Sequence, residues 1–280
     1  MNFKTIMVLA TVIVGMLFTA CQEEYSKSTT GKLKIQLTDA PFPSDLVTEA
    51  NVKINKIEIR KANTTDVNPF VTLSEKEVSF NLLDLTNGVT ASLIDLDIDA
   101  GSYDLIRLYV TDASVVLSDG TVHSLKVPSG SQTGIKIFIT PSIEVSGDLT
   151  TELLLDFDVS KSFKMRGNMN SPAGIKGFIF KPSIKASNLS TTGRLTGNVV
   201  DAENAPIDGV QVAIIAEDNT VYTTTFTDNG EYQFLGVDAG TYKIEYSKEG
   251  YETKTIEDVT IVAGNATVQN AELVAVQAAE

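Results

Sequence analysis

The chain has little of the chemistry on which disulfide bonding and most catalysis depend. Its 280 residues include one cysteine, one histidine and no tryptophan. A single thiol forms neither a disulfide nor a thiolate metal site within one chain, so stability has to come from packed apolar surface. His123 has no base-and-orienter arrangement around it of the kind that activates a nucleophile, and we expect a solvent-facing strand histidine. The sequence therefore predicts a protein that is not an enzyme and uses no cofactor or metal.

Positive charge is also scarce and unevenly placed. The chain has 22 Lys and Arg against 36 Asp and Glu. Residues 31–192 contain 16 basic and 19 acidic side chains, whereas the residues from 193 onward contain 4 and 15. Because a nucleic-acid backbone is held by clustered cations, nucleic acid is not an expected partner. The charge shift instead indicates two domains, the second one strongly acidic.

The one clear apolar run is too short to cross a membrane. It extends from Ile6 to Phe18, is apolar apart from Thr11, and follows a single cation, Lys4. As a helix it would span about 20 Å at ~1.5 Å per residue, which suits the apolar region of an export signal. We expect residues 1–20 to be a signal peptide.

The small residues Thr19 and Ala20 directly before Cys21 resemble the lipobox of bacterial lipoproteins. That resemblance implies that the thiol of Cys21 carries diacylglycerol and that Cys21 becomes the mature N-terminus. Phe18 departs from the pattern, since leucine usually stands there. The alternative is an ordinary secretory signal with a chance cysteine.

The three residues after the cysteine indicate where in the cell envelope the protein is expected. Gln22, Glu23 and Glu24 resemble the acidic export signal of surface lipoproteins in some Gram-negative bacteria, and the alternative is a solvated tether that happens to be acidic. We expect a lipidated tether over residues 21–30, anchored in the outer membrane and exposed at the cell surface.

Short strands are predicted in the domain that follows the tether. Apolar and polar residues alternate from Leu33 to Leu37, the period-two pattern of a strand with one dry face. Alternation from Val52 to Ile59 holds only if the phase slips at Asn55-Lys56, as at a β-bulge. Asp119-Gly120 suits a tight hairpin with two positive-φ residues. Further strands are predicted at Val78–Leu82, Leu105–Val110, Val115–Leu117, Ile135–Ile139, Leu153–Phe157 and Phe178–Ile184. The pattern favours a β-sandwich.

Four ordered motifs make residues 31–187 similar to the bacterial domain-of-unknown-function family 4382. They are Leu37–Pro41, Asn81–Leu85, Ala100–Leu108 and Leu125–Lys136. The resemblance implies a fold and a compartment but no reaction. A short linker is expected at residues 188–192.

The stretch 193–273 resembles the carboxypeptidase regulatory-like domain, a transthyretin-like sandwich, and a tail is expected at 274–280. Tyr232, Tyr242 and Tyr246 fall in phase with apolar neighbours and are expected in its core. The sequence Asp99–Tyr103 reappears as Asp238–Tyr242, which we interpret as shared turn physics. The predicted fold class is all-β, with two immunoglobulin- or transthyretin-like sandwiches.

Three clusters are candidates for binding. Tyr222 and Tyr251 are candidate surface aromatics for carbohydrate. Asp95, Asp97 and Asp99 lack the glycine and the terminal acid of a calcium loop, so a wet strand face is expected. A basic strip between Asp158 and Asp201 contains no acid and is a candidate either for anionic glycan or for docking the acidic second domain, the alternative being a solvated face. Its members are Lys161, Lys164, Arg166, Lys176, Lys181, Lys185 and Arg194.

These features favour a lipid-anchored envelope protein that acts as an interaction or structural module and meets the membrane, a glycan or other envelope proteins. One alternative is a carbohydrate-binding surface lipoprotein associated with glycan uptake. Another is a subunit of a surface assembly that pairs through an exposed strand edge.

Overall fold

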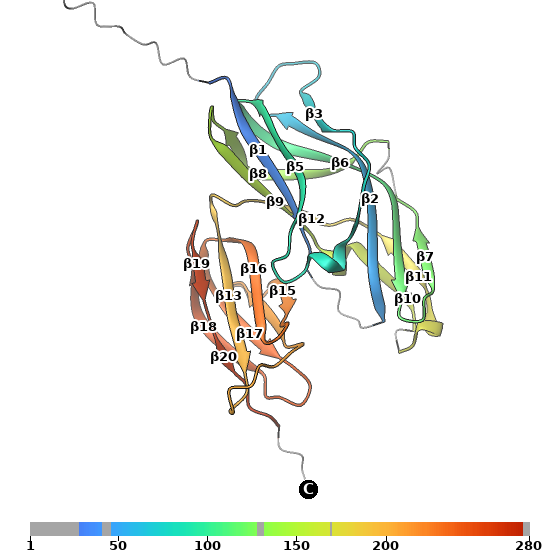
Figure 1. The fold of residues 1–280 in the computed structure, drawn as a ribbon, viewed down its shortest axis with the longest axis vertical. Helices are drawn as coiled ribbons and strands as arrows, with labels where there is room; N and C mark the ends of the chain where they lie inside the picture. Colours follow the sequence, from blue (N-terminus) through green and yellow to red (C-terminus); the bar gives the residue numbers. More distant parts are fainter. Residues whose placement is uncertain (1–27, 41–45, 128–131, 169, 277–280) are drawn as a thin grey trace, which may run out of the picture.

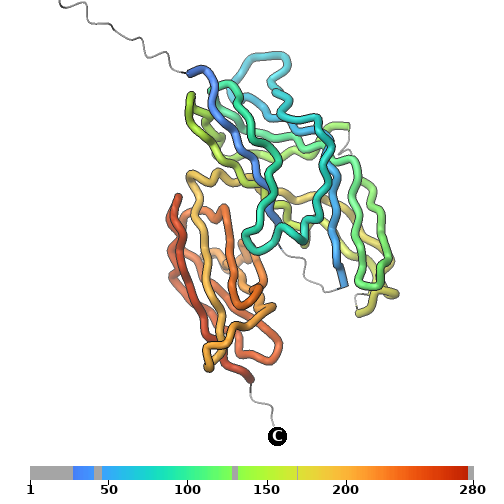
Figure 2. Tube along the Cα trace, viewed as in Figure 1, coloured from blue at the N-terminus to red at the C-terminus, as the bar shows by residue number. Residues whose placement is uncertain are grey.

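In a computed structural model the protein is nearly all β, and the structure describes residues 28–40, 46–127, 132–168 and 170–276. Two β-sandwiches lie side by side, with the start of the first strand and the C-terminal end at opposite ends of the molecule (Figure 1, Figure 2). The predicted signal, Cys21 and the Gln22–Glu24 signal lie outside the described residues. Within the described ranges, no helix is long and apolar enough to cross a membrane.

The first sandwich is built from two sheets and a hairpin. One sheet has the order β12-β9-β1-β5, with β1 parallel to β9 and antiparallel to β5. Its strands are β1 (Thr30–Thr38), β5 (Ala91–Asp99), β9 (Thr150–Phe157) and β12 (Ile184–Asn188). The other sheet has the order β3-β2-β6-β7, with β4 on β2 and β8 on β6. Its strands are β2 (Val47–Lys61), β3 (Phe70–Ser74), β4 (Val78–Asn81), β6 (Gly101–Leu117), β7 (Val122–Leu125) and β8 (Ile135–Val145).

Strands β10 (Phe163–Gly167) and β11 (Ile175–Phe180) form a separate antiparallel hairpin. Three short helical turns complete the domain: η1 (Leu82–Leu85), α2 (Val159–Ser162) and η2 (Pro172–Gly174).

Local periodicity positions this core as predicted. Leu33, Ile35 and Leu37 are fully buried, and the polar residues between them face outward. The pairing of β2 with β6 skips Asn55, because the register shifts between Ile54 and Lys56. The predicted bulge is therefore confirmed, and it returns the apolar residues of both halves of β2 to one core.

Some boundaries differ from the sequence prediction. The two strands expected around Val110 and Val115 form one long strand, β6, whereas the strand expected at Phe178–Ile184 is interrupted between β11 and β12. Of the Asp119-Gly120 pair, only Gly120 has positive φ, at 84°. A hairpin does form at the predicted position, between β6 and β7. Its loop is closed by the Leu117 N–H, which donates to the Thr121 carbonyl, and it is wider than the predicted two-residue turn, so one left-handed residue is enough.

The second sandwich has sheets of order β16-β13-β19, with β20 on β13, and β15-β14-β17-β18. Its strands are β13 (Thr192–Val200), β14 (Gln211–Ile215), β15 (Val221–Phe226), β16 (Glu231–Asp238), β17 (Gly240–Ser247), β18 (Lys254–Ile261), β19 (Ala266–Val268) and β20 (Ala271–Glu272). Tyr232, Tyr242 and Tyr246 are buried as predicted. The hydroxyls of Tyr232 and Tyr246 lie 2.9 Å apart, so the polar ends of these core rings satisfy one another.

The connection between the domains is shorter than the expected linker at 188–192. Asn188 is the last residue of β12 and Thr192 the first of β13, which leaves a three-residue turn. The Asn188 carbonyl accepts from the hydroxyls of Thr191 and Thr192 at 3.2 and 3.0 Å. This hydrogen-bonded turn fixes the exit direction of the chain.

The repeated Asp-Ala-Gly-x-Tyr motif has a common structure. Tyr103 donates its hydroxyl to the Asp99 carbonyl at 2.8 Å, and Tyr242 donates to the Asp238 carbonyl at 2.9 Å. Each tyrosine thus ties its strand to the carbonyl four residues earlier. The glycines differ, because Gly101 has positive φ and the other glycine does not.

Candidate functional site

The two sandwiches meet through a polar junction near the start of β12. The Lys185 ammonium lies 2.8 Å from a carboxylate oxygen of Asp238, and it also donates to the Tyr222 hydroxyl. Tyr222 in turn donates to the same carboxylate oxygen at 2.8 Å. Burial opposes the charge of Lys185, but the hydrogen bonds to Asp238 and Tyr222 outweigh it and raise the pKa of Lys185. Burial likewise opposes ionisation of Asp238, and the contacts with Lys185 and Tyr222 still lower its pKa.

A second set of contacts forms beside η1. The Asn87 side chain accepts from the Gln233 N–H at 2.7 Å and donates to the Glu231 carbonyl at 3.3 Å. At Gly236 a Cβ would stand 3.0 Å from Leu154 of the opposite domain, and φ there is 65°. Close approach and side-chain hydrogen bonds on both sides therefore hold the domains together.

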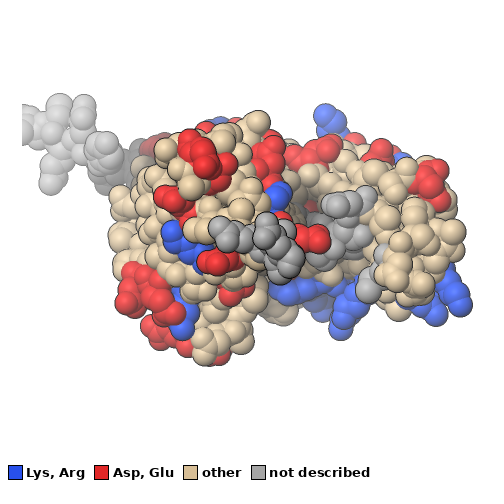
Figure 3. All heavy atoms as spheres, turned by 90° about the horizontal axis from the view of Figure 1, so that it is seen from below, with Lys and Arg blue, Asp and Glu red and all other residues tan. Residues whose placement is uncertain are grey.

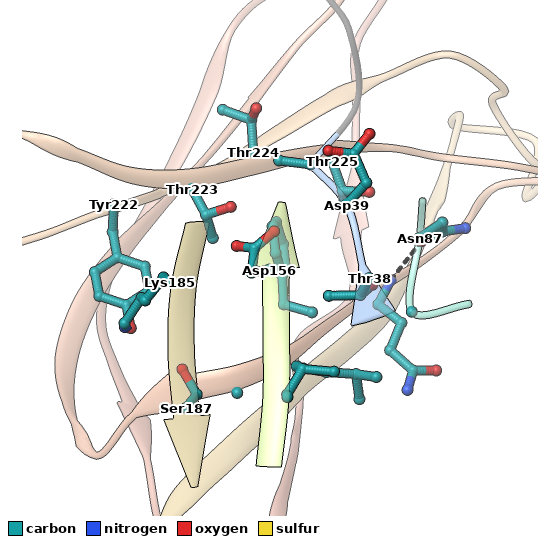
Figure 4. Close-up of a pocket in the computed structure, with 17 residues that line it drawn as sticks. Thr38, Asp39, Asn87, Asp156, Lys185, Ser187, Tyr222, Thr223, Thr224 and Thr225 are labelled. Carbon is teal, nitrogen blue, oxygen red and sulfur yellow. Dashed lines mark hydrogen bonds between the residues drawn. The ribbon is translucent and has the colours of Figure 1, made fainter. Parts of the chain in front are cut away.

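Between these contacts lies a small cavity of about 50 Å³, lined by polar and apolar residues of both domains (Figure 4). Asp39 follows β1, Asp156 lies on β9, and Thr225 comes from β15 of the second domain. Asp39 and Thr225 are only 6% and 2% exposed. The Asp39 Oδ1 accepts from the Val159 N–H at 2.9 Å. The cavity is far smaller than the 300 Å³ or so typical of a site for an organic ligand.

Three buried oxygens around this cavity have no hydrogen-bond partner among the described residues: Asp39 Oδ2, Asp156 Oδ1 and Thr225 Oγ1. Burial raises the pKa of Asp156 to about 6, with repulsion from Asp158 adding to it. Burial also raises the pKa of Asp39 well above its usual value, and the charge on Asp156 contributes. The cavity thus has two acidic side chains and three oxygens that lack a hydrogen-bond partner among the described residues.

A different surface forms on the hairpin of β10 and β11. Its inner side contributes Phe163 and Phe180 to the core, while its outer side has exposed cations beside the half-exposed Ile179. Four exposed cations lie on or beside this hairpin and form what we call the basic hairpin face: Lys164, Arg166, Lys176 and Lys181. Across the described ranges, none of the four has a carboxylate within 4 Å. Viewed from below, several lysines and arginines gather along the lower right edge of the molecule, while acidic residues form separate patches elsewhere (Figure 3).

Comparison with known families decides the identity of the first domain. Residues 30–182 match the domain of unknown function DUF4382, which is more than half of the chain. The chain belongs to the DUF4382 family. Residues 194–274 match the carboxypeptidase regulatory-like domain. Both resemblances predicted from the sequence are confirmed, in the predicted order.

This DUF4382 protein is also similar to the serine-aspartate repeat-containing protein D of Staphylococcus aureus (strain Newman), with 28% identity over 154 residues. The match covers 54% of the chain but spans only 10% of the relative. Among solved structures, a type II cohesin–X-dockerin complex from Acetivibrio cellulolyticus is 24% identical over 30% of this chain and 58% of its own, with a TM-score of 0.25. The minor pilin GBS52 of Streptococcus agalactiae is 11% identical over 88% and 98%, with a TM-score of 0.27.

The structure separates the members of the basic strip predicted from the sequence. Lys185 lies in the domain junction, while Lys161 pairs with Asp158 of its own domain at 2.7 Å. Arg194 lies in β13 of the second domain. The remaining four residues form the basic hairpin face of the DUF4382 domain. One stretch of sequence therefore supplies both a docking contact and an exposed cationic surface.

The two tyrosines proposed for carbohydrate pack partly against the core of the second domain. The Tyr222 ring meets Tyr242 edge to face at 5.6 Å, and its hydroxyl is engaged by Lys185 and Asp238, so it is not a free surface platform. Tyr251 pairs with Ala275 in an isolated bridge. A carbohydrate-binding role for the pair stays a prediction.

The strand aspartates of the DUF4382 domain lie on an exposed face, as predicted. Lys32 lies 3.3 Å from Asp95 and 3.7 Å from Asp97, and Lys61 lies 2.8 Å from Asp99. The described residues include no group of three or more His, Cys, Asp or Glu side chains that could hold a metal.

His123 differs from the expectation of a solvent-facing residue. Its ring meets Phe178 edge to face at 5.5 Å, and its Nε2 is buried without a partner among the described residues. The reason is the hairpin of β10 and β11, which covers the side of β7 that includes His123. The sequence pattern does not predict this hairpin as a separate layer.

Sequence reasoning missed the cavity residues. Asp39 enters the sequence analysis only as part of the motif Leu37–Pro41, and Thr225 has no distinguishing local pattern. The one available signal was Asp156, an acid within the apolar run Leu153–Phe157 of a strand that is buried on both faces. A carboxylate in such a strand needs a partner or a proton.

Proposed function

We propose that the protein is a non-enzymatic, lipid-anchored module of the bacterial cell envelope, held in the outer membrane at the cell surface through Cys21. The observation that carries the interaction role is the basic hairpin face, an exposed cationic surface without a carboxylate partner in the described part of the chain, on a protein of net charge −14. The anchor rests on the lipobox resemblance of the residues up to Cys21. The match of the second domain to a regulatory-like rather than a catalytic unit supports a role without chemistry. Two or three acyl chains, at about 0.8 kcal/mol per buried CH₂, would hold the chain on the bilayer almost permanently.

The anchor would leave the basic hairpin face directed away from the membrane. The chain enters the first domain at Thr30, at the upper end of β1, whereas β10 and β11 lie at the lower end (Figure 1). The nine residues from Cys21 to Thr29 reach at most about 30 Å at ~3.3–3.6 Å each. The basic hairpin face would therefore meet a partner on the far side, and its own bilayer would not cover it.

The anchor predicts a sharp effect of Cys21→Ser. A serine hydroxyl does not replace the thiol in lipid transfer, so the variant is expected in the soluble fraction or as an unprocessed precursor. Phe18→Leu is the matched control and is expected to stay membrane-bound. Intact mass of the native chain, together with detergent-free washing of envelopes, makes the measurement; an unmodified Cys21 sulfur would refute the anchor.

Binding of an anionic glycan is the second candidate function, and the basic hairpin face favours it. The four cations have no carboxylate partner among the described residues, so they are available to a ligand, and they attract a polyanion over a distance set by ionic strength. A carboxylated polysaccharide meets this requirement along an extended face without an aromatic platform.

Removing the hairpin charges is expected to weaken binding to polygalacturonate about tenfold or more. The test variant carries Lys164→Gln, Arg166→Gln and Lys176→Gln, and affinity is measured on the immobilised polymer in 0.1 M and 1 M salt. Binding by the unaltered protein should fall at the higher salt, where the Debye length shortens to about 3 Å.

The matched control removes three lysines that already lie near carboxylates: Lys32→Gln, Lys53→Gln and Lys243→Gln. It has the same net charge as the test variant and should bind nearly as the unaltered protein does. Equal losses in the two triple variants would show that only overall charge matters, and the glycan assignment would be dropped.

A further inference from the structure

The cavity between the domains contains more negative charge than its surroundings neutralise. Two cations lie close by, but each already has a carboxylate partner. Lys161 is 2.7 Å from Asp158, and Lys185 is 2.8 Å from Asp238. Asp39 and Asp156 have no ion pair within 4 Å anywhere in the described part of the chain. The buried Asp39 and the half-buried Asp156 are therefore two carboxylates without a compensating positive charge.

The free atoms around the cavity are all oxygens. Asp39 Oδ2, Asp156 Oδ1 and Thr225 Oγ1 have no hydrogen-bond partner among the described residues, and Asp39 and Thr225 are more than nine-tenths buried. Leaving a buried polar atom unpaired is costly, and a charged one more so, and three such atoms around one cavity therefore point to a bound ligand. Carboxylate and hydroxyl oxygens are the donors that hard cations prefer.

We propose that Asp39, Asp156 and Thr225 hold a calcium ion that joins the two sandwiches. The cavity of about 50 Å³ exceeds the roughly 10–15 Å³ that a single water needs, so it has room for the ion. The double charge of the ion matches the two uncompensated carboxylates. Because Thr225 belongs to the second domain and the two aspartates to the first, the ion would stabilise the docked arrangement (Figure 4). This inference does not depend on the lipid anchor or on glycan binding.

Calorimetric titration of CaCl₂ into the chelator-treated full chain in detergent, at pH 7.5, tests the proposal. We expect saturable binding of one ion and a rise in Tm of roughly 5–10 °C at a calcium concentration about 100 times Kd. Asp39→Asn and Asp156→Asn should each weaken binding about tenfold or more, and Thr225→Val less. Asp39→Asn keeps the oxygen that accepts from Val159, so its fold should persist.

Asp97→Asn on the exposed face of β5 is the matched control and should leave calcium affinity unchanged. Two results would overturn the assignment. One is the absence of binding heat and of any Tm change up to 10 mM calcium, roughly the weak limit of extracellular calcium modules. The other is binding that survives both cavity substitutions. A loss of calcium affinity in Thr225→Val would distinguish binding at this site from attraction to a generally acidic surface, because the substitution removes no charge.

Discussion

Replacing Phe157 by alanine is expected to lower the free energy of unfolding of the first domain by about 3–5 kcal/mol. The side chain is fully buried on β9, with ring centroids 6.2 Å from Phe180 and 6.4 Å from Phe163. Its loss would leave a cavity where the β10–β11 hairpin attaches to the main sheet. Urea unfolding followed by circular dichroism measures the change.

Phe138→Ala is the matched control for this prediction. Phe138 is 64% exposed on β8, so the same chemical deletion removes little buried surface and should change stability by less than about 0.5 kcal/mol. Similar losses in the two variants would mean that the aromatic cluster does not hold the hairpin to the sandwich.

Gly197→Ala should destabilise the second domain by roughly 3 kcal/mol or more. A Cβ at Gly197 would stand 1.9 Å from the Gln269 carbonyl oxygen and 2.8 Å from the Tyr232 ring. Backbone has to move to relieve this clash. The movement separates Gln269 from the Tyr232 hydroxyl, which donates to its carbonyl at 2.6 Å. Thermal unfolding of the full chain should show a lower Tm for the transition of the second domain.

Gly240→Ala provides the comparison at a position without such crowding. The nearest atoms to a Cβ there belong to Tyr242 at 3.4 Å or more, and φ is outside the left-handed region. Alanine should be neutral or add up to about 1 kcal/mol, because it restricts the unfolded chain. If the two alanines had the same effect, close backbone packing at Gly197 would not be the cause.

Strand faces could be predicted from the sequence because they depend on neighbours two residues apart. Leu33, Ile35 and Leu37 show this in β1, and even the bulge at Asn55 was visible as a phase slip. The core tyrosines of the second domain followed from the same alternation. Family motifs supplied the order of the two domains.

The junction could not be predicted in the same way. Lys185 and Asp238 are 53 positions apart, and Asn87 and Gln233 are 146 apart. No local pattern specifies which strand ends meet across two domains, so the cavity carboxylates resembled ordinary turn and strand residues. The basic strip was visible as composition, but only the fold separates the docking Lys185 from the exposed cations of the hairpin.

The position of β1 determines how the protein would bear a mechanical load. Strand β1 lies between β9 and β5, is hydrogen-bonded on both sides, and is not at a sheet edge. A pull on its N-terminal side acts along the strand, so the hydrogen bonds to both neighbours share the force and must yield together. Under the proposed lipid anchor at Cys21, tension on the chain would therefore shear the sheet and would not unzip it.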